Sequence, residues 1–365
     1  MAKGAYIGVD GIARKIKKVY IGADGIARKI RKAYIGIGGI ARPCFSSESL
    51  EYYGTITPLS VGRYDIGATS IGDYALFGGG RTDTYITSKI VDAYDKSLTH
   101  SNPTELSKSR NSAAATSIGD YALFGGGLAE GNSDYLDTVD AYNMSLTRST
   151  PTVLSVARKP EATTIGEYAL FGGGGNASAV VDTYNKSLTR SKAADMIEAR
   201  RAHAATSIGN YALFGGGDVD TNAIDVYNKS LTHSTPIELS SLRRALSATS
   251  VGNYALFGGG GYTGSDIVDA FDMSLTRYLA TPLSGKRYTM SATTVGNYAL
   301  FGGGNSSSGV TDTVDIYDYS LSRTSLKLSK ARTYLSATSI GNYALFGGGI
   351  DNSNINIVDA FVIIQ

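Results

Sequence analysis

Seven near-identical segments that end in three glycines divide most of the chain into units of similar length. The octet "NYALFGGG" begins at Asn210, Asn253, Asn297 and Asn342. Close variants of it begin at Asp73, Asp120 and Glu167. Successive copies lie 43 to 47 residues apart. A period in the forties that recurs seven times is typical of helical repeat arrays or of propeller blades, so we expect a repeat protein.

The content of each unit favours blades over helices. A unit contains a segment like "ATSIG", then the octet, then a variable loop, then a segment like "VDAYDKSLT". These are short β-branched and aromatic runs between glycine and asparagine turn signals, without the apolar spacing of a helix. We expect four strands in each unit, here called a (ATS), b (YALF), c (VDAY) and d (SLTR to ELS). Four-stranded antiparallel sheets that pack radially form a β-propeller.

The two ends of the repeat region complete the seventh unit. The last copy runs to Gln365 and has room for strands a, b and c but not for d. A matching d segment stands before the first octet, because Ser49–Arg63 aligns with Ser97–Arg110. Pairing it with the last strand c closes a ring at a loop-entropy cost of roughly 5 kcal/mol, which a strand of hydrogen bonds and buried side chains offsets. We therefore expect an all-β fold with a seven-bladed propeller over residues 46–365.

Three features of the units occur in the order seen in kelch repeats. An arginine precedes strand a, a glycine run follows strand b, and an aromatic residue before a turn ends strand c. These aromatic residues are Tyr94, Tyr142, Tyr184, Tyr227, Phe271, Tyr317 and Phe361. The chain thus resembles the kelch family, which implies glycines near the central channel, where they allow close approach and positive φ. It departs from that family in having no tryptophan, so the resemblance says little about a partner.

One face of such a propeller differs from the other. Antiparallel order places the d–a connections and the b–c loops on one face, and only short, repeated turns on the other. The b–c loops vary between units and are rich in Ser, Asn, Asp and Thr, for example "DVDTNA" from Asp218 and "DNSNIN" from Asp351. Because binding residues concentrate on loops held by a rigid scaffold, we expect the loop face to bind a ligand.

An arginine precedes strand a in all seven units. The arginines are Arg63, Arg110, Arg158, Arg200, Arg243, Arg287 and Arg332. In one interpretation they form a ring that contacts a carboxylate ligand bidentately, as arginines at this place do in some kelch relatives. In the other they pair with loop carbonyls or with the strand c aspartates. Those aspartates are Asp92, Asp140, Asp182, Asp225, Asp269, Asp315 and Asp359.

The residue inventory does not favour an enzyme. A galactose-oxidase-like kelch enzyme would need copper ligands and a Cys–Tyr cofactor, yet the single cysteine, Cys44, precedes the propeller. The chain has three histidines. We expect His100 and His233 to be solvated and His203 to be structural. No helix is indicated after the glycine triplets, so a phosphate cradle is not expected either. We predict a non-enzymatic protein without a metal or cofactor.

Residues 1–45 form a second repeat region with a 14-residue period. Its copies are "AYIGVDGIARKIKK", "VYIGADGIARKIRK" and "AYIGIGGIARPCFS". The pairs Asp10-Gly11, Asp24-Gly25 and Gly38-Gly39 are signals for type I′ hairpin turns. Residues 1–44 carry a net charge of +8, whereas the remainder carries −6.

A single hairpin is too small to be stable alone, so the basic hairpin arm is expected to contact a partner or further copies of itself. Nucleic acid is not favoured, because no pattern supports base readout, and a solvated strip is the other interpretation. The residues expected to anchor the arm are Tyr6, Arg14, Tyr20, Arg28, Tyr34 and Arg42.

The short repeat resembles the Tyr-Ile-Gly, Asp-Gly, Ala-Arg-Lys repeats near the start of structural proteins of tailed phages and prophages of Gram-positive bacteria. The resemblance implies a tail, baseplate or fibre protein, held on a phage or phage-tail-like particle by its arm. The propeller loops would bind a receptor, a glycan or a neighbouring virion protein. The N-terminus shows no secretory signal and no membrane-inserting segment, so synthesis in the bacterial cytoplasm is expected. The alternative is a cytoplasmic kelch adaptor that binds an acidic peptide through the arginine ring.

Overall fold

The computed structural model describes the backbone of six strands within residues 6–46, and residues 48–364 except 83–85, 133, 176–177 and 219–221. The chain divides into two compact units. One comprises Met1–Glu51 with Val362–Gln365, and the other comprises Tyr52–Phe361. Each unit is described by itself.

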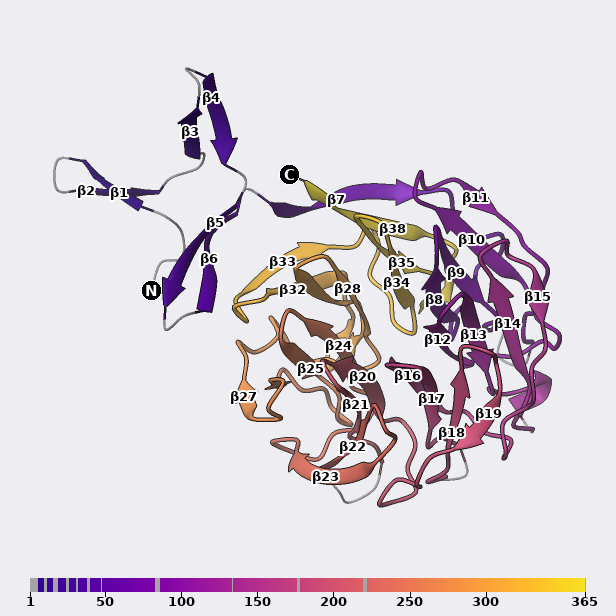
Figure 1. Ribbon diagram of the computed structural model, residues 1–365. Coiled ribbons are helices and arrows are strands. Elements are labelled where there is room, and N and C mark those ends of the chain that lie inside the picture. Colours follow the sequence, from indigo (N-terminus) through magenta and orange to yellow (C-terminus); the bar gives the residue numbers. More distant parts are fainter. Residues whose placement is uncertain are drawn as a thin grey trace. The chain divides into compact units, whose positions relative to one another are not determined.

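The larger unit is a seven-bladed β-propeller of four-stranded antiparallel sheets (Figure 1). Blade 1 contains β8 (Gly67–Ile71), β9 (Tyr74–Gly78), β10 (Val91–Asp95) and β11 (His100–Ser101). Blade 2 contains β12 (Ala114–Ile118), β13 (Tyr121–Gly125), β14 (Val139–Asn143) and β15 (Arg148–Ser149). Blade 3 contains β16 (Glu161–Ile165), β17 (Tyr168–Gly172), β18 (Val181–Asn185) and β19 (Arg190–Lys192).

The remaining blades repeat this order. Blade 4 contains β20 (Ala204–Ile208), β21 (Tyr211–Gly215), β22 (Ala223–Asn228) and β23 (His233–Glu238). Blade 5 contains β24 (Ser247–Val251), β25 (Tyr254–Gly258), β26 (Val268–Phe271) and β27 (Arg277–Leu279). Blade 6 contains β28 (Ser291–Val295), β29 (Tyr298–Gly302), β32 (Thr313–Asp318) and β33 (Arg323–Lys327).

Blade 7 is built from both ends of the repeat region. It contains β34 (Ser336–Ile340), β35 (Tyr343–Gly347), β38 (Val358–Ile364) and β7 (Ser49–Ile56), in that order across the sheet. The hydroxyl of Tyr52 donates to Oδ1 of Asp359 over 2.7 Å, and its ring packs on Phe361 with centroids 5.3 Å apart. Figure 1 shows purple β7 beside yellow β38. The predicted all-β propeller with ring closure is confirmed.

Short elements lie in the connections between strands b and c. They are the 3-10 turn η1 (Glu130–Asn132), the pair β30 (Asn305–Ser306) and β31 (Gly309–Val310), and the pair β36 (Ile350–Asp351) and β37 (Ser353–Asn354).

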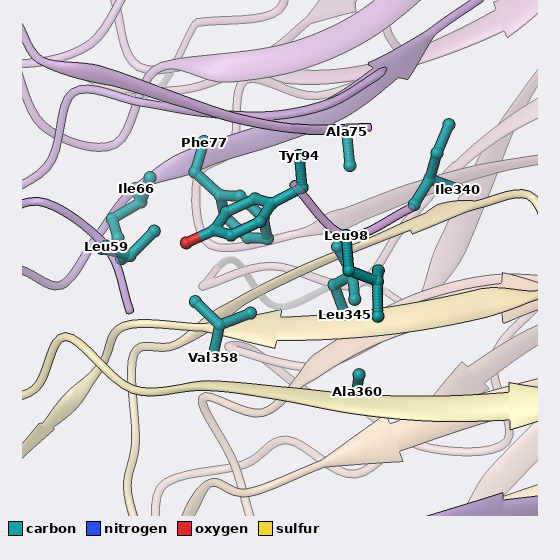
Figure 2. Close-up of a cluster of buried hydrophobic side chains, with 10 residues drawn as sticks. All are labelled: Leu59, Ile66, Ala75, Phe77, Tyr94, Leu98, Ile340, Leu345, Val358 and Ala360. Atoms are coloured by element: carbon teal, nitrogen blue, oxygen red, sulfur yellow. The ribbon is translucent and has the colours of Figure 1, made fainter. Parts of the chain in front are cut away.

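The core lies between the blades. Strand b is buried on both faces, so Ala75, Leu76 and Phe77 are all inaccessible to solvent. Figure 2 shows the cluster between blades 7 and 1, where Phe77 and Tyr94 face Val358 and the side chains around it. Equivalent clusters join other neighbouring blades. Each blade therefore depends on its neighbours to bury its apolar faces.

The glycine triplet sets how closely the blades approach. A Cβ added to Gly78 would lie 2.8 Å from the ring of Phe124 in blade 2, and the same clash recurs around the ring. The next two glycines of blade 1 have positive φ, and the N–H of Gly80 donates to the carbonyl of Arg110 in blade 2 over 2.8 Å. The predicted packing role of the triplets is confirmed: one glycine admits the next blade's Phe, and two form the turn that bonds to it.

The smaller unit contains three antiparallel hairpins. They are β1 (Tyr6–Val9) with β2 (Ile12–Lys15), β3 (Val19–Ala23) with β4 (Ile26–Ile30), and β5 (Lys32–Ile37) with β6 (Ile40–Ser46). The predicted turn pairs Asp10-Gly11, Asp24-Gly25 and Gly38-Gly39 lie outside the described residues, as do the side chains of the six residues expected to anchor the arm. The anchoring role of residues 1–45 stays a prediction.

Deletion of β7 tests the closure. Removing residues 1–57 deletes this strand, leaves β38 as an unpaired edge and removes Tyr52 from Asp359. Each hydrogen bond lost costs about 1 kcal/mol, so we expect the melting temperature to fall by about 10 °C or the protein to aggregate. Removing residues 1–47 keeps β7 and should leave melting unchanged. Equal melting of the two truncated proteins in circular dichroism would contradict the closure.

Candidate functional site

The d–a connections and the b–c loops meet at one end of the blades. In blade 1, Tyr64 of the connection forms an antiparallel bridge with Arg81 of the loop. Blades 2, 6 and 7 form the equivalent bridges Asn111 to Leu128, Tyr288 to Asn305 and Thr333 to Ile350. The prediction that these two kinds of loop share a face is confirmed.

The seven connections surround a hollow of about 590 Å³, here called the mouth. Every blade contributes residues that stand shortly after the repeated arginine, and the b–c loops of blades 2 and 3 add Leu128, Tyr135 and Gly175. One from each blade, in order, are Asp65, Ser112, Lys159, Arg201, Arg244, Thr289 and Tyr334. The volume falls within the range of small-molecule sites, about 300–1,000 Å³.

A ring of backbone hydrogen bonds frames the mouth. The second residue after the arginine has a left-handed conformation in six blades, with φ of 51–55°. In five of these six residues, all but Ala202, the N–H donates to the carbonyl of the counterpart in the preceding blade. These bonds are Ser112 to Asp65 (2.7 Å), Asp65 to Tyr334 (3.1 Å), Tyr334 to Thr289 (3.4 Å), Thr289 to Ala245 (3.0 Å) and Ala245 to Ala202 (2.8 Å). Left-handed conformations of non-glycine residues persist where the surrounding structure holds them. The same conformation recurs at six leucines in the turns between strands c and d, so it belongs to the repeat and does not by itself mark a site.

Blade 3 breaks this ring. Its connection is one residue shorter, and Pro160, which has no N–H, stands where the other blades have the left-handed residue. Among the described backbone bonds, none links Pro160 to Ser112 or to Ala202. Glu161 then begins strand a, where the other six blades carry a small residue. Those residues are Gly67, Ala114, Ala204, Ser247, Ser291 and Ser336.

Charge and aromatic groups are distributed unevenly around the mouth. Lys159, Arg201 and Arg244 come from the adjacent blades 3, 4 and 5. Asp218 fixes Arg201 through Nε at 2.5 Å, and Arg244 lies over the ring of Tyr262 at 5.0 Å from its centroid. On the other side, Tyr334 of blade 7 packs on Tyr64 of blade 1 with centroids 6.3 Å apart. The cations of the mouth therefore lie together at blades 3 to 5, whereas a tyrosine pair without an adjacent mouth cation lies at blades 7 and 1.

Two titratable groups of the mouth have strongly shifted pKa values. His203 is 3% exposed, and neither ring nitrogen makes a hydrogen bond of good geometry. Burial, together with the nearby charge of Arg200, lowers the pKa of His203 to about 3, so its ring is neutral. Burial raises the pKa of Glu161 to about 7, and Lys159 opposes that shift. Glu161 keeps some exposure to the mouth, so water moderates its shift.

The seven repeated arginines lie inside the blades. Each is 0–3% exposed and forms an ion pair with the strand c aspartate of its own blade. Each Nη2 also donates to the carbonyl of the strand b Phe, for example Arg158 to Phe171 over 2.9 Å. The structure thus agrees with the second interpretation of the arginine ring: each arginine pairs with a strand c aspartate, and its guanidinium group is buried away from solvent.

The aspartates collect further donors, as blade 1 illustrates. Asp92 accepts from the N–H and hydroxyl of Ser60 (2.9 and 2.6 Å) and from Arg63. Its Oδ1 also lies 2.7 Å from Nε2 of His100. Burial alone would raise the pKa of Asp92, but Arg63 and the Ser60 bonds hold it below its usual range.

Two expectations about histidine were therefore wrong. His100 and His233 are not solvated: their Nε2 atoms lie 2.7 and 2.6 Å from the buried carboxylates of Asp92 and Asp225. Arg148, Arg190 and Arg323 make the equivalent contact in blades 2, 3 and 6. The sequence signal for this contact was the spacing: the histidine or arginine of strand d stands eight residues after the strand c aspartate. His203 is buried in the blade, at a position where most other blades carry an apolar side chain.

Sequence reasoning missed the mouth residues themselves. The informative signal was the variation of the two residues after an otherwise constant arginine, which are Tyr-Asp in the first unit and Arg-Ala in the fourth. It also missed the serine three residues before the arginine, which six of the seven units carry. That serine bonds to the same aspartate as the arginine, for example Ser284 to Asp315 over 3.0 Å.

No protein-family model matches this chain, and no curated protein matches its sequence. In the described part of the chain, no helix has the length and apolarity to cross a membrane. A rigid propeller with a polar mouth at one end is the architecture of a binding scaffold, and that general role follows from the fold.

Removing one partner of a buried pair tests its contribution to stability. Asp140→Asn leaves the guanidinium of Arg110 buried without a counter-charge, so the free energy of unfolding should fall by about 3–5 kcal/mol. The control Glu167→Gln removes an exposed pair with Lys186 and should cost less than about 1 kcal/mol. Urea unfolding measures both, and equal losses would contradict the account.

Glu161→Gln tests the raised pKa. As pH rises, the unfolded chain loses this proton near 4.5 and the folded chain near 7. The folded protein holds the extra proton between these values, so its stability falls with pH in that window and levels off above it. The amide side chain of the variant cannot ionise, so the variant should gain about 1–2 kcal/mol over the wild type between pH 5 and pH 8. Parallel urea-unfolding profiles for the two proteins would refute the shift.

Proposed function

We propose that this chain is a non-enzymatic binding protein of a phage or phage-tail-like particle. The basic hairpin arm, residues 1–45, attaches it to the particle, and the mouth of the kelch-like propeller binds a ligand on the host surface. One observation carries the binding part of this proposal. The repeat positions that differ between blades meet at the mouth, whereas those that pair within the blades stay constant.

Pairing inside each blade explains why some repeat positions stay constant. The arginine, the aspartate and the strand b carbonyl satisfy one another inside each blade, so changes there would leave a buried charge unpaired. The residues just after the arginine carry no such constraint. They are free to change without loss of fold, as expected of a surface that adapts to a ligand.

The non-catalytic role rests on the groups that the mouth brings together. Glu161 and His203, whose pKa values are the most strongly shifted in the mouth, make no hydrogen bond to each other or to a nucleophile among the described residues. Acid–base or nucleophilic catalysis would need such a bond. The adaptor alternative receives no support from the arginine ring, because those guanidinium groups are buried.

The attachment part rests on the sequence of the arm. Its +8 charge suits an acidic protein surface, and its short repeats resemble those of tailed-phage structural proteins. We place the finished protein in the virion, with other tail proteins or further copies of the arm as its partners.

Two matched changes separate the two halves of the proposal. Deleting residues 1–45 should abolish co-purification with particles from the producing cells but leave binding to host cells intact. Substituting both Arg201 and Arg244 with alanine should weaken host-cell binding at least tenfold and leave co-purification intact. Lys229→Ala removes an exposed cation from the opposite face and should change neither.

Mass spectrometry of purified particles and flow cytometry of cells with labelled protein provide the readouts. Retention of one cytoplasmic partner by both altered proteins, with no particle association of the full chain, would overturn the proposal in favour of an adaptor.

A further inference from the structure

The sector of the mouth around blade 3 differs from the rest. A Cβ added to Gly175 would lie 2.0 Å from the ring of Tyr135, so that ring, from the b–c loop of blade 2, lies directly on the blade 3 backbone. Tyr135 also interacts with Arg201 of blade 4. A single aromatic side chain thus spans blade 3, where the backbone ring is broken at Pro160.

Six residues that line the mouth define this sector, here called the blade-3 niche. They are Tyr135, Lys159, Glu161, Gly175, Arg201 and His203. Lys159 is exposed and Arg201 is 58% exposed. The niche therefore offers one aromatic face, two accessible cations, a carboxyl group and a neutral imidazole.

His203 is the strongest sign that the niche holds a ligand. Five other blades have a residue at the same repeat position, and in each it is a buried apolar residue. These residues are Ile66, Ala113, Leu246, Met290 and Leu335. Neither ring nitrogen makes a well-aligned hydrogen bond, and the backbone of Gly172 is the one polar group that favours the charged form of the ring by hydrogen bonding. Buried polar groups are nearly always hydrogen-bonded, and an unmade bond costs about 1–3 kcal/mol. A polar group retained at this cost in a binding cavity is explained when a ligand supplies the missing partner.

We propose that the blade-3 niche binds a uronic acid residue of an acidic glycan, an inference that rests on the proposed function of the mouth. The sugar carboxylate pairs with Lys159 and Arg201. Neighbouring hydroxyls, which both donate and accept, satisfy His203 and Glu161. The apolar face of the sugar ring lies on Tyr135.

Other ligands leave part of the niche unsatisfied. An acidic peptide supplies carboxylates for the two cations but no hydroxyl groups for Glu161 and His203. A neutral sugar satisfies Glu161 and His203 but leaves Lys159 without a counter-charge, whereas Arg201 already pairs with Asp218. Only a group that combines a carboxylate with adjacent hydroxyls uses all four polar side chains.

Calorimetric titration of the full-length protein at pH 7 tests this. The probes are a hyaluronan tetrasaccharide, which contains glucuronate, the neutral chitotetraose, and a glutamate-rich peptide. We expect the hyaluronan fragment to bind at least tenfold more tightly than either of the others. His203→Leu, which installs the Leu246 side chain of blade 5, should weaken binding at least tenfold and raise the melting temperature by several degrees.

Glu161→Ala gives blade 3 the alanine that blades 2 and 4 carry at this position, and it should also weaken binding at least tenfold. This variant is the test if His203→Leu does not fold. His233→Arg is the matched control outside the mouth, since blades 2, 3 and 6 carry arginine there, and it should bind as the wild type does. Absence of hyaluronan binding, equal binding of chitotetraose or the peptide, or full binding by either niche variant would overturn the inference. If those results occur while the protein still binds host cells through Arg201 and Arg244, the proposed function survives and only the ligand class is wrong.

Discussion

The buried ion pair between the repeated arginine and the strand c aspartate is the interaction on which the rest of the structure depends. It joins the connection before strand a to strand c, and the same guanidinium bonds to the carbonyl of the strand b Phe. The arginine's own carbonyl accepts the N–H of the last glycine in the preceding blade's triplet, as Arg110 does from Gly80. One residue therefore ties the connection before strand a to strands b and c of its own blade, and joins that blade to its neighbour.

This arrangement also determines where binding can occur. Because the arginine is held deep in the blade, the residues after it emerge at the end of the axis and enclose the mouth. Six blades share one backbone conformation there, and blade 3 departs from it through Pro160. The departure places Glu161 in the lining of the mouth, to which His203 of blade 4 also belongs. A nearly seven-fold scaffold thereby gains one chemically distinct sector.

The blade number, strand order and closure could be predicted because they depend on patterns that repeat, such as the octet and the match of Ser49–Arg63 to Ser97–Arg110. The burial of the arginine side chain could not be predicted. An arginine that pairs with an aspartate and an arginine that contacts a ligand would stand at the same repeat position, so the sequence does not distinguish them. The contacts of His100 and His233 were missed for a related reason: each pairs with an aspartate that also serves an arginine. The niche escaped notice because Tyr135, Glu161 and His203 come from three different blades.

Selective chemical labelling of two lysines tests the central claim, that the mouth is the binding face, most directly. Lys159 and Lys229 are both exposed, the first at the mouth and the second on the short-turn face. Acetylation rates measured by mass spectrometry, with the protein free and bound to host cells, compare the two faces in one sample. The account predicts that Lys159 becomes protected on binding while Lys229 keeps its rate. Protection of Lys229 with Lys159 still reactive would contradict it.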